Sequence, residues 1–217
     1  KKKGINIIPT MIEDEITRIN IFLNDGEGEF KFVNSGSFVD SDKQEEMLNV
    51  LRNLNDLEYL TINGSLPPGI DPDYYDKILN ICKEKETKVI IDISSPKLKE
   101  LLKYKPFLIK PNNHELAEMF NVELNSTEDV VFYARKLKEM GAQNVLISMG
   151  KDGALLVTEK DEVFASSVAK GEVVNSVGAG DSMVAGFIAG YLKSNSYEEA
   201  LRLGAASGGA TAFSSDL

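Results

Sequence analysis

Apolar residues after position 40 follow two alternating spacings, one typical of helices and one typical of buried strands. Leu48 and Leu51 lie at helical spacing, and Ser41 with Gln44 three residues later has the form of a capping box at the start of that helix. Further helices are expected to begin near Asp71, Asn113 and Ser126 and to cover 179–193 and 197–213. Strands are expected at 57–62, 88–93, 107–110, 145–149 and 154–158.

This alternation of strands and helices predicts the fold class. Strands joined through helices of this length form right-handed crossovers, so the sheet should be mostly parallel with helices on both faces, an α/β fold. The chain before residue 35 differs: 4–13, 17–24 and 29–34 are rich in Ile, Thr and Phe and favour a small separate sheet or flap. We therefore expect a β-rich part over 1–34 and an α/β core over 35–217.

The charge of the chain limits which binding partners are expected, and its cysteine content limits the cellular compartment. The 217 residues contain 24 Lys and Arg against 34 Asp and Glu, a net charge of −10. A nucleic acid or an anionic membrane surface needs a positive field, so neither is expected as a partner. The single cysteine, Cys82, excludes an internal disulfide and favours the cytoplasm. Because the chain begins with Lys1 and not Met, we expect it to be a segment of a longer protein.

The strongest candidate for chemistry is the stretch NSVGAGDS at 175–182, which runs into a helix. Glycines before a helix start leave backbone amides free to face an anion, and the helix dipole favours negative charge there. An aspartate in this place suits a base that accepts a proton from an attacking hydroxyl, here Asp181, while the amides of Ala179 and Gly180 stabilise a phosphoryl group. The alternative is an ordinary helix N-cap.

Three further motifs follow strands, and each also has a purely structural interpretation. Asn112 and Glu115 can face one site as oxygen ligands for hydrated magnesium, or can simply cap a helix. SMGKDG at 148–153 is either a plain hairpin turn or part of a ligand site at the sheet edge. Ser65, in NGSLPPG at 63–69, has the same two interpretations. Arg18 is either a surface charge or a clamp for an anionic substrate.

Two common phosphate-binding motifs are absent from the sequence. No Gly-x-x-x-x-Gly-Lys-Ser/Thr loop occurs, and Met183 stands where a dinucleotide-binding motif needs its third glycine. The sequence therefore argues against binding of a nicotinamide cofactor.

In this order, the motifs resemble the PfkB group of ribokinase-like carbohydrate kinases. NSVGAGDSMVAGFI at 175–188 resembles the C-terminal signature of that family, and GSLP at 64–67, KPN with Glu115 at 110–115 and SMGKDG at 148–153 resemble its other landmarks. The resemblance implies a three-layer αβα sandwich with a small β lid. It also implies ATP and Mg²⁺ as cofactors, a sugar phosphate as small-molecule partner, and a homodimer formed through the lid.

The resemblance also assigns roles to individual residues. It makes Asp181 the catalytic base and places Gly178, Ala179 and Gly180 in the anion hole for the transferred phosphate. It implies that Arg18 and Ser65 bind the sugar phosphate and that Asn112 and Glu115 position magnesium through water. The ATP-binding residues that it implies are Ser148, Gly150, Lys151, Gly153, Ala205, Ala206 and Gly208.

Within the family, the combination is most similar to kinases that convert fructose 1-phosphate to fructose 1,6-bisphosphate. Kinases of tagatose 6-phosphate or fructose 6-phosphate are the alternative enzymes, and an inactive nucleotide-binding fragment is the alternative class. The family begins with a sugar-binding strand and a Gly-Gly-Lys-Gly-x-Asn motif, which this sequence lacks. By analogy, roughly 70–80 residues are expected to be missing at the front. We therefore expect the 217-residue chain itself to be inactive.

Overall fold

The computed structural model describes residues 4–13, 15–24, 29–168 and 171–214. The chain forms two compact units, one from 1–57 with 66–85 and the other from 58–65 with 86–217. The first unit contains strands β1 (Asn20–Asn24) and β2 (Glu29–Val33) and helices α1 (Ser41–Asn53) and α2 (Tyr74–Glu84). The second contains β3 (Tyr59–Asn63), β4 (Lys88–Asp92), β5 (Leu108–Ile109), β6 (Asn144–Ser148), β7 (Ala154–Val157), β8 (Val163–Ser166), α3 (Leu98–Leu101), α4 (Asn113–Phe120), α5 (Thr127–Glu139), α6 (Ala179–Ser194) and α7 (Tyr197–Ala212).

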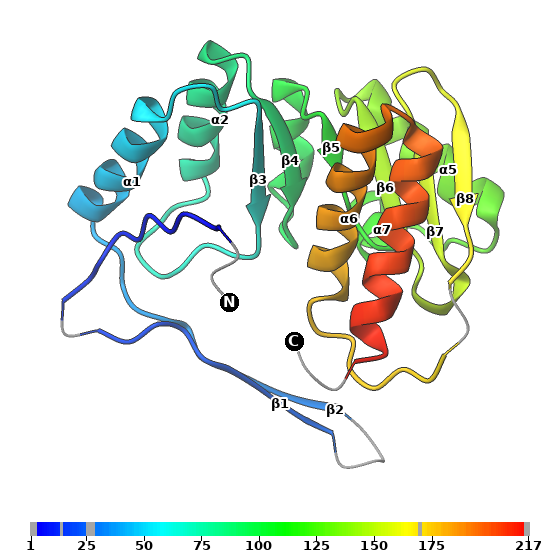
Figure 1. The fold of residues 1–217 in the computed structure, drawn as a ribbon, viewed down its shortest axis with the longest axis horizontal. Helices are drawn as coiled ribbons and strands as arrows, with labels where there is room; N and C mark the ends of the chain where they lie inside the picture. Colours follow the sequence, from blue (N-terminus) through cyan, green and yellow to red (C-terminus); the bar gives the residue numbers. More distant parts are fainter. Residues whose placement is uncertain (1–3, 14, 25–28, 169–170, 215–217) are drawn as a thin grey trace. The chain divides into compact units, whose positions relative to one another are not determined.

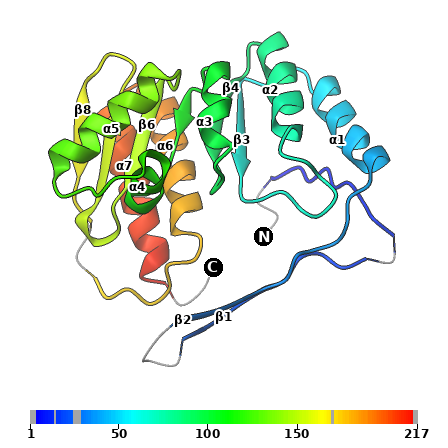
Figure 2. The same cartoon turned by 180° about the vertical axis from the view of Figure 1, so that it is seen from behind.

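The second unit is built on a sheet with the strand order β3-β4-β5-β6-β7-β8. Pairing is parallel from β3 to β6, and β7 and β8 add in antiparallel orientation. Helices α6 and α7 cover one face of this sheet (Figure 1), and α3, α4 and α5 cover the other (Figure 2). The expected α/β class with a mostly parallel sheet is confirmed. Strand β8 was not expected. It has only four residues, and exposed and half-buried side chains alternate along it, so it lacks a run of buried residues.

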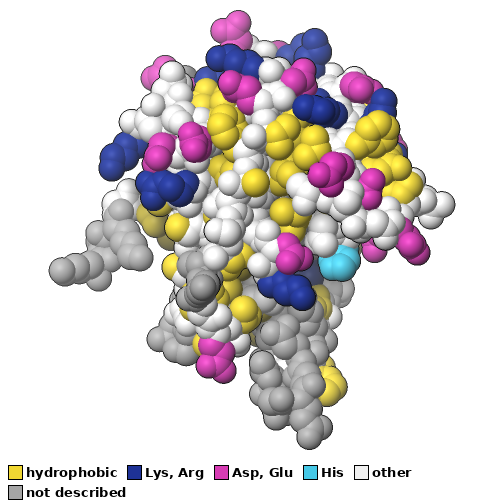
Figure 3. Space-filling view, turned by 90° about the vertical axis from the view of Figure 1, so that its right-hand side faces the viewer, with side chains coloured by type: hydrophobic (Ala, Val, Ile, Leu, Met, Phe, Trp, Pro, Cys, Tyr) yellow, Lys and Arg dark blue, Asp and Glu magenta, His cyan; other side chains and the backbone are white. Residues whose placement is uncertain are grey.

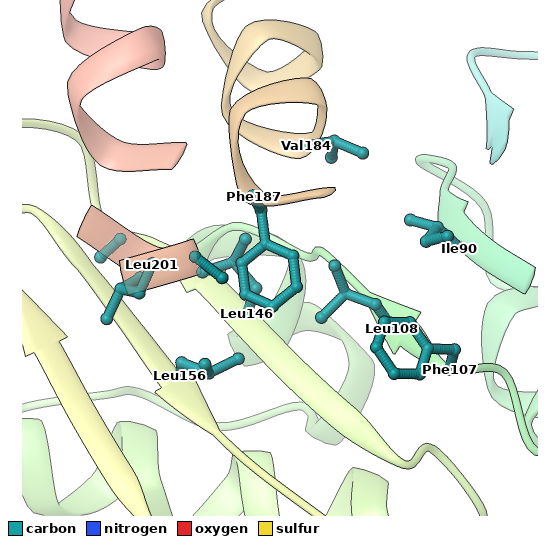
Figure 4. Packing of buried hydrophobic residues seen from close by; sticks show 10 residues of the cluster. Ile90, Phe107, Leu108, Leu146, Leu156, Val184, Phe187 and Leu201 are labelled. Atoms are coloured by element: carbon teal, nitrogen blue, oxygen red, sulfur yellow. The ribbon is translucent and has the colours of Figure 1, made fainter. Parts of the chain in front are cut away.

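The core of the second unit lies between the sheet and α6. Phe187 of α6 is fully buried and points into a group of strand and helix side chains that includes Leu108, Leu146 and Leu201 (Figure 4). Burying an aromatic side chain of this kind contributes about 1.5–3 kcal/mol. This packing fixes α6 against the sheet, and α6 carries the GAGD motif at its first turn.

Helices α6 and α7 approach each other closely because glycines occur where they touch. A Cβ atom added at Gly204 would lie 2.8 Å from the carbonyl oxygen of Met183, and one at Gly208 would lie 2.9 Å from the carbonyl oxygen of Ala179. Such distances are below normal van der Waals contact, so any side chain at these positions would push the helices apart. Backbone therefore packs directly against backbone along this pair.

Charged side chains of both signs cover the outer surface on the side where β8 and α5 lie. Figure 3 shows Lys and Arg interspersed with Asp and Glu on this face, with apolar side chains visible between them. No continuous field of one sign forms on the part of this face that the structure describes.

The first unit departs from the sequence predictions at three helix or strand boundaries. Residues 4–13 form no strand, although their composition favours one. The N-cap of α1 is Asp40 and not Ser41: its carboxylate accepts from the Lys43 amide at 2.8 Å, and Gln44 donates instead to the carbonyl oxygens of Val39 and Gly69. Helix α2 begins at Tyr74, not at Asp71.

Strands β1 and β2 form an antiparallel ribbon, and four of its apolar residues share one face. The register pairs Ile21 with Phe32 and Leu23 with Phe30, and all four side chains are more than half exposed. Residues 25–28, between the two strands, and the opening lysines lie outside the described residues. A two-stranded ribbon is marginally stable alone, so this apolar face favours a further contact.

Candidate active site

The first turn of α6 has no side-chain cap, and its Ala179 amide donates to the Ser176 carbonyl oxygen at 3.3 Å. Gly178 is the N-cap residue at φ +72°, and no side chain accepts a hydrogen bond from this end of the helix. The left-handed conformation favours glycine, because a Cβ atom there would strain the backbone. Since the N-terminal amides of a helix carry a partial positive charge, the turn formed by Gly178, Ala179 and Gly180 is suited to an anion.

Asp181 lies in the same turn and is oriented by a residue from β3. The side-chain amide of Asn63 donates a hydrogen bond of 3.0 Å to Oδ1 of Asp181. Asn63 is the last residue of β3, so the contact joins the carboxyl end of a strand to the amino end of a helix. Asp181 and Asn63 both line a cavity of about 310 Å³. The sequence motif contained Asn63, but nothing in the sequence indicated this contact.

A buried ion pair lies next to this turn. The ammonium of Lys110 is 3.1 Å from Oδ1 of Asp92, and the two side chains are 7% and 18% exposed. Burial raises the pKa of Asp92; Lys110 opposes that shift, and the charges of Asp181 and Glu115 add to it. Asp92 is thus influenced by two neighbouring carboxylates and by the lysine that it pairs with. Asp92 and Lys110 directly follow apolar strand residues, and that position is the sequence signal that could have identified them.

Asn112 and Glu115 form a reciprocal capping box at the start of α4. The Glu115 amide donates to the Asn112 side chain at 2.8 Å, and the Asn112 amide donates to the Glu115 carboxylate at 2.8 Å. Ser94 donates to the other carboxylate oxygen of Glu115. The structure therefore contains the helix cap that was one of the two interpretations of Asn112 and Glu115.

The same oxygen atoms are the kind that bind a hydrated magnesium ion. Among the described residues, no group of three or more His, Cys, Asp or Glu side chains is arranged to hold a metal ion directly. Hard amide and carboxylate oxygens from Asn112 and Glu115, near Asp92, do suit a hydrated Mg²⁺ that is contacted through its water shell. The role of these residues in magnesium binding stays a prediction.

A cavity of about 670 Å³ extends from the first turn of α6 along α7. This volume falls within the range of small-molecule and cofactor sites. Its lining includes Ala179 and Gly180 of the anion turn and Lys110 of the ion pair. Six of the seven expected ATP-binding residues also line it: Ser148, Gly150, Lys151, Gly153, Ala205 and Gly208. Ala206, the seventh, is exposed and does not line the cavity. Val173 and Phe213 complete the apolar wall and were missed by the sequence analysis.

The turn between β6 and β7 is a hairpin turn and also borders the cavity. It connects antiparallel strands, and the Met149 amide donates to the Gly153 carbonyl oxygen at 2.8 Å, as in a hairpin. A Cβ atom at Gly153 would lie 2.1 Å from the Ser166 carbonyl oxygen, so only glycine fits there. The same turn borders the cavity, which is where a ligand at the sheet edge was expected.

The two expected substrate-binding residues belong to different units of the chain. Ser65 is exposed in the loop after β3, and Arg18 belongs to the first unit, where its side chain packs at Gly36. Their roles in binding a sugar phosphate stay predictions.

Comparison with known proteins decides the family. Residues 1–216 match the pfkB family of carbohydrate kinases, which is almost the whole chain. The chain belongs to this family. The expected resemblance is thereby confirmed, together with the ribokinase-like fold class.

Two relatives and one solved structure show which proteins of the family this chain is similar to. The 1-phosphofructokinase of Bacillus subtilis is 44% identical over 201 residues, covering 93% of this chain and 66% of that protein. The D-tagatose-1-phosphate kinase of Bacillus licheniformis is 42% identical over 213 residues, covering 97% of this chain and 69% of that protein. The tetrameric inhibited form of phosphofructokinase-2 from Escherichia coli superimposes with a TM-score of 0.80 at 28% identity, covering 91% of this chain and 66% of that one. The chain therefore spans about two thirds of the length of these relatives. None of the helices in its described residues has the length and apolar character needed to cross a membrane.

Proposed function

We propose that this chain is the catalytic core of an ATP-dependent kinase that phosphorylates a ketose monophosphate, converting fructose 1-phosphate to fructose 1,6-bisphosphate. The observation that carries the proposal is the first turn of α6. There a helix end without a side-chain cap, suited to a phosphoryl group, lies beside a carboxylate that Asn63 holds in place. The adjoining cavity has the volume for a nucleotide.

Each group of the site has a defined part in the transfer. Asp181 accepts the proton of the sugar hydroxyl as that oxygen forms a bond to the γ-phosphorus, and the bond from phosphorus to the departing ADP oxygen breaks. The amides of Ala179 and Gly180 stabilise the charge that spreads over the phosphoryl oxygens. Asn112 and Glu115 would hold a hydrated Mg²⁺ through its water shell, and the ion would supply further neutralisation of phosphate charge. Arg18 and Ser65 bind the sugar phosphate.

The identity of the sugar rests on the relatives. One is named a 1-phosphofructokinase and another a D-tagatose-1-phosphate kinase, so the names favour a ketohexose with its phosphate on C1. D-tagatose 1-phosphate is therefore a second candidate substrate, ahead of the 6-phosphates of tagatose and fructose. The deciding residues should lie in the part of the relatives that this chain does not cover.

A coupled assay of ADP release from the full-length protein tests the proposal. We expect fructose 1-phosphate to give the highest kcat/KM in a panel of fructose and tagatose 1- and 6-phosphates, and the 217-residue chain to bind Mg-ATP weakly without sugar-dependent turnover. Preference for another acceptor would reassign the substrate. Absence of ADP release with every sugar phosphate would overturn the kinase proposal.

The apolar ribbon of the first unit supports a homodimer formed through β1 and β2. One face carries Ile21, Leu23, Phe30 and Phe32, all exposed, and a second copy of the ribbon would bury them. Sedimentation velocity should give a dimer for the protein and a monomer for a Phe30→Lys, Phe32→Lys variant with an unchanged circular dichroism spectrum. An unchanged dimer mass in that variant would exclude this face. We also assign the protein to the cytoplasm, as its lone buried cysteine suggests.

A further inference from the structure

The anion turn, residues 178–180, carries no side chain that could hold it in place. Two of its residues are glycines and the third is Ala179, and Gly178 provides no side-chain cap for the helix. Groups that stabilise a developing charge must be held within about 0.5 Å of their productive geometry. The contacts that fix this turn must therefore come from other parts of the fold.

Helix α7, which runs beside α6 (Figures 1 and 2), supplies such contacts from one face. Thr211 and Ala212 follow Gly208 by three and four positions, so the three residues share a side of the helix. Gly208 packs against the turn itself, because a Cβ atom there would lie 2.9 Å from the carbonyl oxygen of Ala179. The Ala212 carbonyl oxygen accepts hydrogen bonds from the amides of residues 174 and 175, at 2.9 and 3.1 Å. The chain is therefore held at the turn and just before it.

Thr211 holds the chain on the other side of the turn. Its hydroxyl donates a 2.7 Å hydrogen bond to the hydroxyl oxygen of Ser182, and both side chains are half-buried. Ser182 directly follows Asp181, and its amide donates to the Gly178 carbonyl oxygen at 2.9 Å, which closes the first turn of the helix. A bond to the Ser182 side chain therefore acts on the short segment that carries both the amides and the carboxylate.

The hydroxyl pair adds a directional contact to a helix pair that otherwise packs through small residues. Apolar contact is non-directional, whereas a hydrogen bond sets both a distance and an angle. We propose that Thr211 is a positioning residue, which acts through Ser182 to fix the first turn of α6 against the transferred phosphoryl group. Thr211 does not line the cavity of about 670 Å³, so it acts without touching the nucleotide placed there. The inference rests on the kinase function proposed above.

Kinetics of the full-length protein test this role with two substitutions at one position. Thr211→Val replaces the hydroxyl by a methyl group of similar shape, and Thr211→Ser keeps the hydroxyl. We expect Thr211→Val to lower kcat about tenfold and to change the KM for ATP and for the sugar phosphate less than about threefold, because a misplaced turn weakens the transition state more than the bound substrates. Thr211→Ser should recover most of kcat. An unchanged kcat in Thr211→Val, or an equal loss in Thr211→Ser, would overturn the proposal.

A double-mutant cycle tests whether Thr211 acts through Ser182. Ser182→Ala removes the acceptor of the hydrogen bond and leaves Thr211 in place. If one bond carries the effect, the double variant should lose no more of kcat than the more impaired single variant. Two losses that multiply would show that the hydroxyls act separately, and would overturn the assignment of Thr211.

Ser194→Ala is a matched control at the opposite end of α6. The Ser194 hydroxyl donates to the Gly190 carbonyl oxygen at 2.7 Å, so this variant also removes one hydroxyl hydrogen bond from the helix. It should leave kcat unchanged, because the bond lies away from the first turn. A loss of kcat equal to that of Thr211→Val would make the effect a general one of helix stability and would overturn the proposal.

Amide hydrogen exchange of the full-length protein supplies a readout that needs no turnover. Loss of one hydrogen bond should let residues 178–182 exchange about fivefold faster in Thr211→Val, and at the unmodified rate in Thr211→Ser. Unchanged exchange in Thr211→Val would overturn the proposal, because the turn would then be held without the bond. If the unmodified protein released no ADP with any sugar phosphate, the kinase proposal would fail instead, while exchange would still show whether Thr211 holds the turn.

Discussion

Replacing Asp181 by Asn removes one negative charge from the first turn of α6 and keeps the shape of the side chain. The Oδ1 atom of Asn still accepts the 3.0 Å hydrogen bond from Asn63, so the orientation of the side chain should persist. The amide can no longer take a proton from a sugar hydroxyl. The substitution therefore separates proton transfer from packing.

The expected magnitudes differ sharply between catalysis and stability. A positioned base contributes about 10²–10⁴ in rate, so kcat should fall by that factor. A negative charge in the first turn of a helix stabilises it by about 0.3–1 kcal/mol, and each kcal/mol corresponds to about 2–4 °C in Tm for a protein of this size. The Tm should therefore fall by at most about 4 °C. ATP affinity should change little, because Asp181 does not line the cavity of about 670 Å³ proposed for the nucleotide.

Single-turnover measurements of the full-length protein check the rate. Calorimetry checks the ATP affinity, and thermal unfolding checks the Tm. Glu198→Gln is the matched control: it removes a first-turn charge from the adjacent helix α7, so it should lower Tm by a similar amount and leave kcat intact. A loss of less than tenfold in single-turnover rate for Asp181→Asn would refute the assignment of Asp181 as the base.

Three further predictions address other parts of the molecule. Arg18→Ala should raise the KM for the sugar phosphate about ten- to a hundredfold and leave the KM for ATP unchanged, and equal rises in steady-state assays would show that it is no specific clamp. Gly178→Ala should cost about 1–2 kcal/mol in thermal or denaturant unfolding because of its φ of +72°, whereas an unchanged midpoint would show that the turn tolerates a Cβ. Burial raises the pKa of the Cys82 thiol to about 11, so about one molecule in a thousand carries the thiolate at pH 8. A disulfide reagent should therefore label it only after unfolding, and rapid labelling of folded protein would contradict its burial.

Local signals explain why some elements could be predicted from the sequence. Asn112 and Ser126 both cap their helices as expected, because a capping residue acts within a few positions of itself. The same signal misplaced the cap of α1, since Asp40 and Ser41 are both good N-caps and distant carbonyl oxygens engage Gln44. Strand propensity over 4–13 failed for the same reason: a strand needs a partner, which propensity does not supply.

The candidate site was predictable as a set of residue types and not as a set of contacts. Parallel strands end at one edge, and polar residues at or after strand ends, such as Ser148 and Asn112, do line one cavity there. The contact between Asn63 and Asp181 spans 118 positions, and the pair of Lys110 and Asp92 depends on β4 and β5 being neighbours. Strand order is a property of the whole fold, so no local pattern could have identified either contact.

The glycine contacts between α6 and α7 have a consequence for how the two helices respond to a ligand. Because backbone packs on backbone at Gly204 and Gly208, the two helices should unfold as one cooperative unit, and their amides should exchange with deuterium at a common rate. The anion turn belongs to one helix and part of the cavity wall to the other. Nucleotide binding to that wall should then slow exchange along both helices together, so a ligand at α7 protects the turn that carries Asp181.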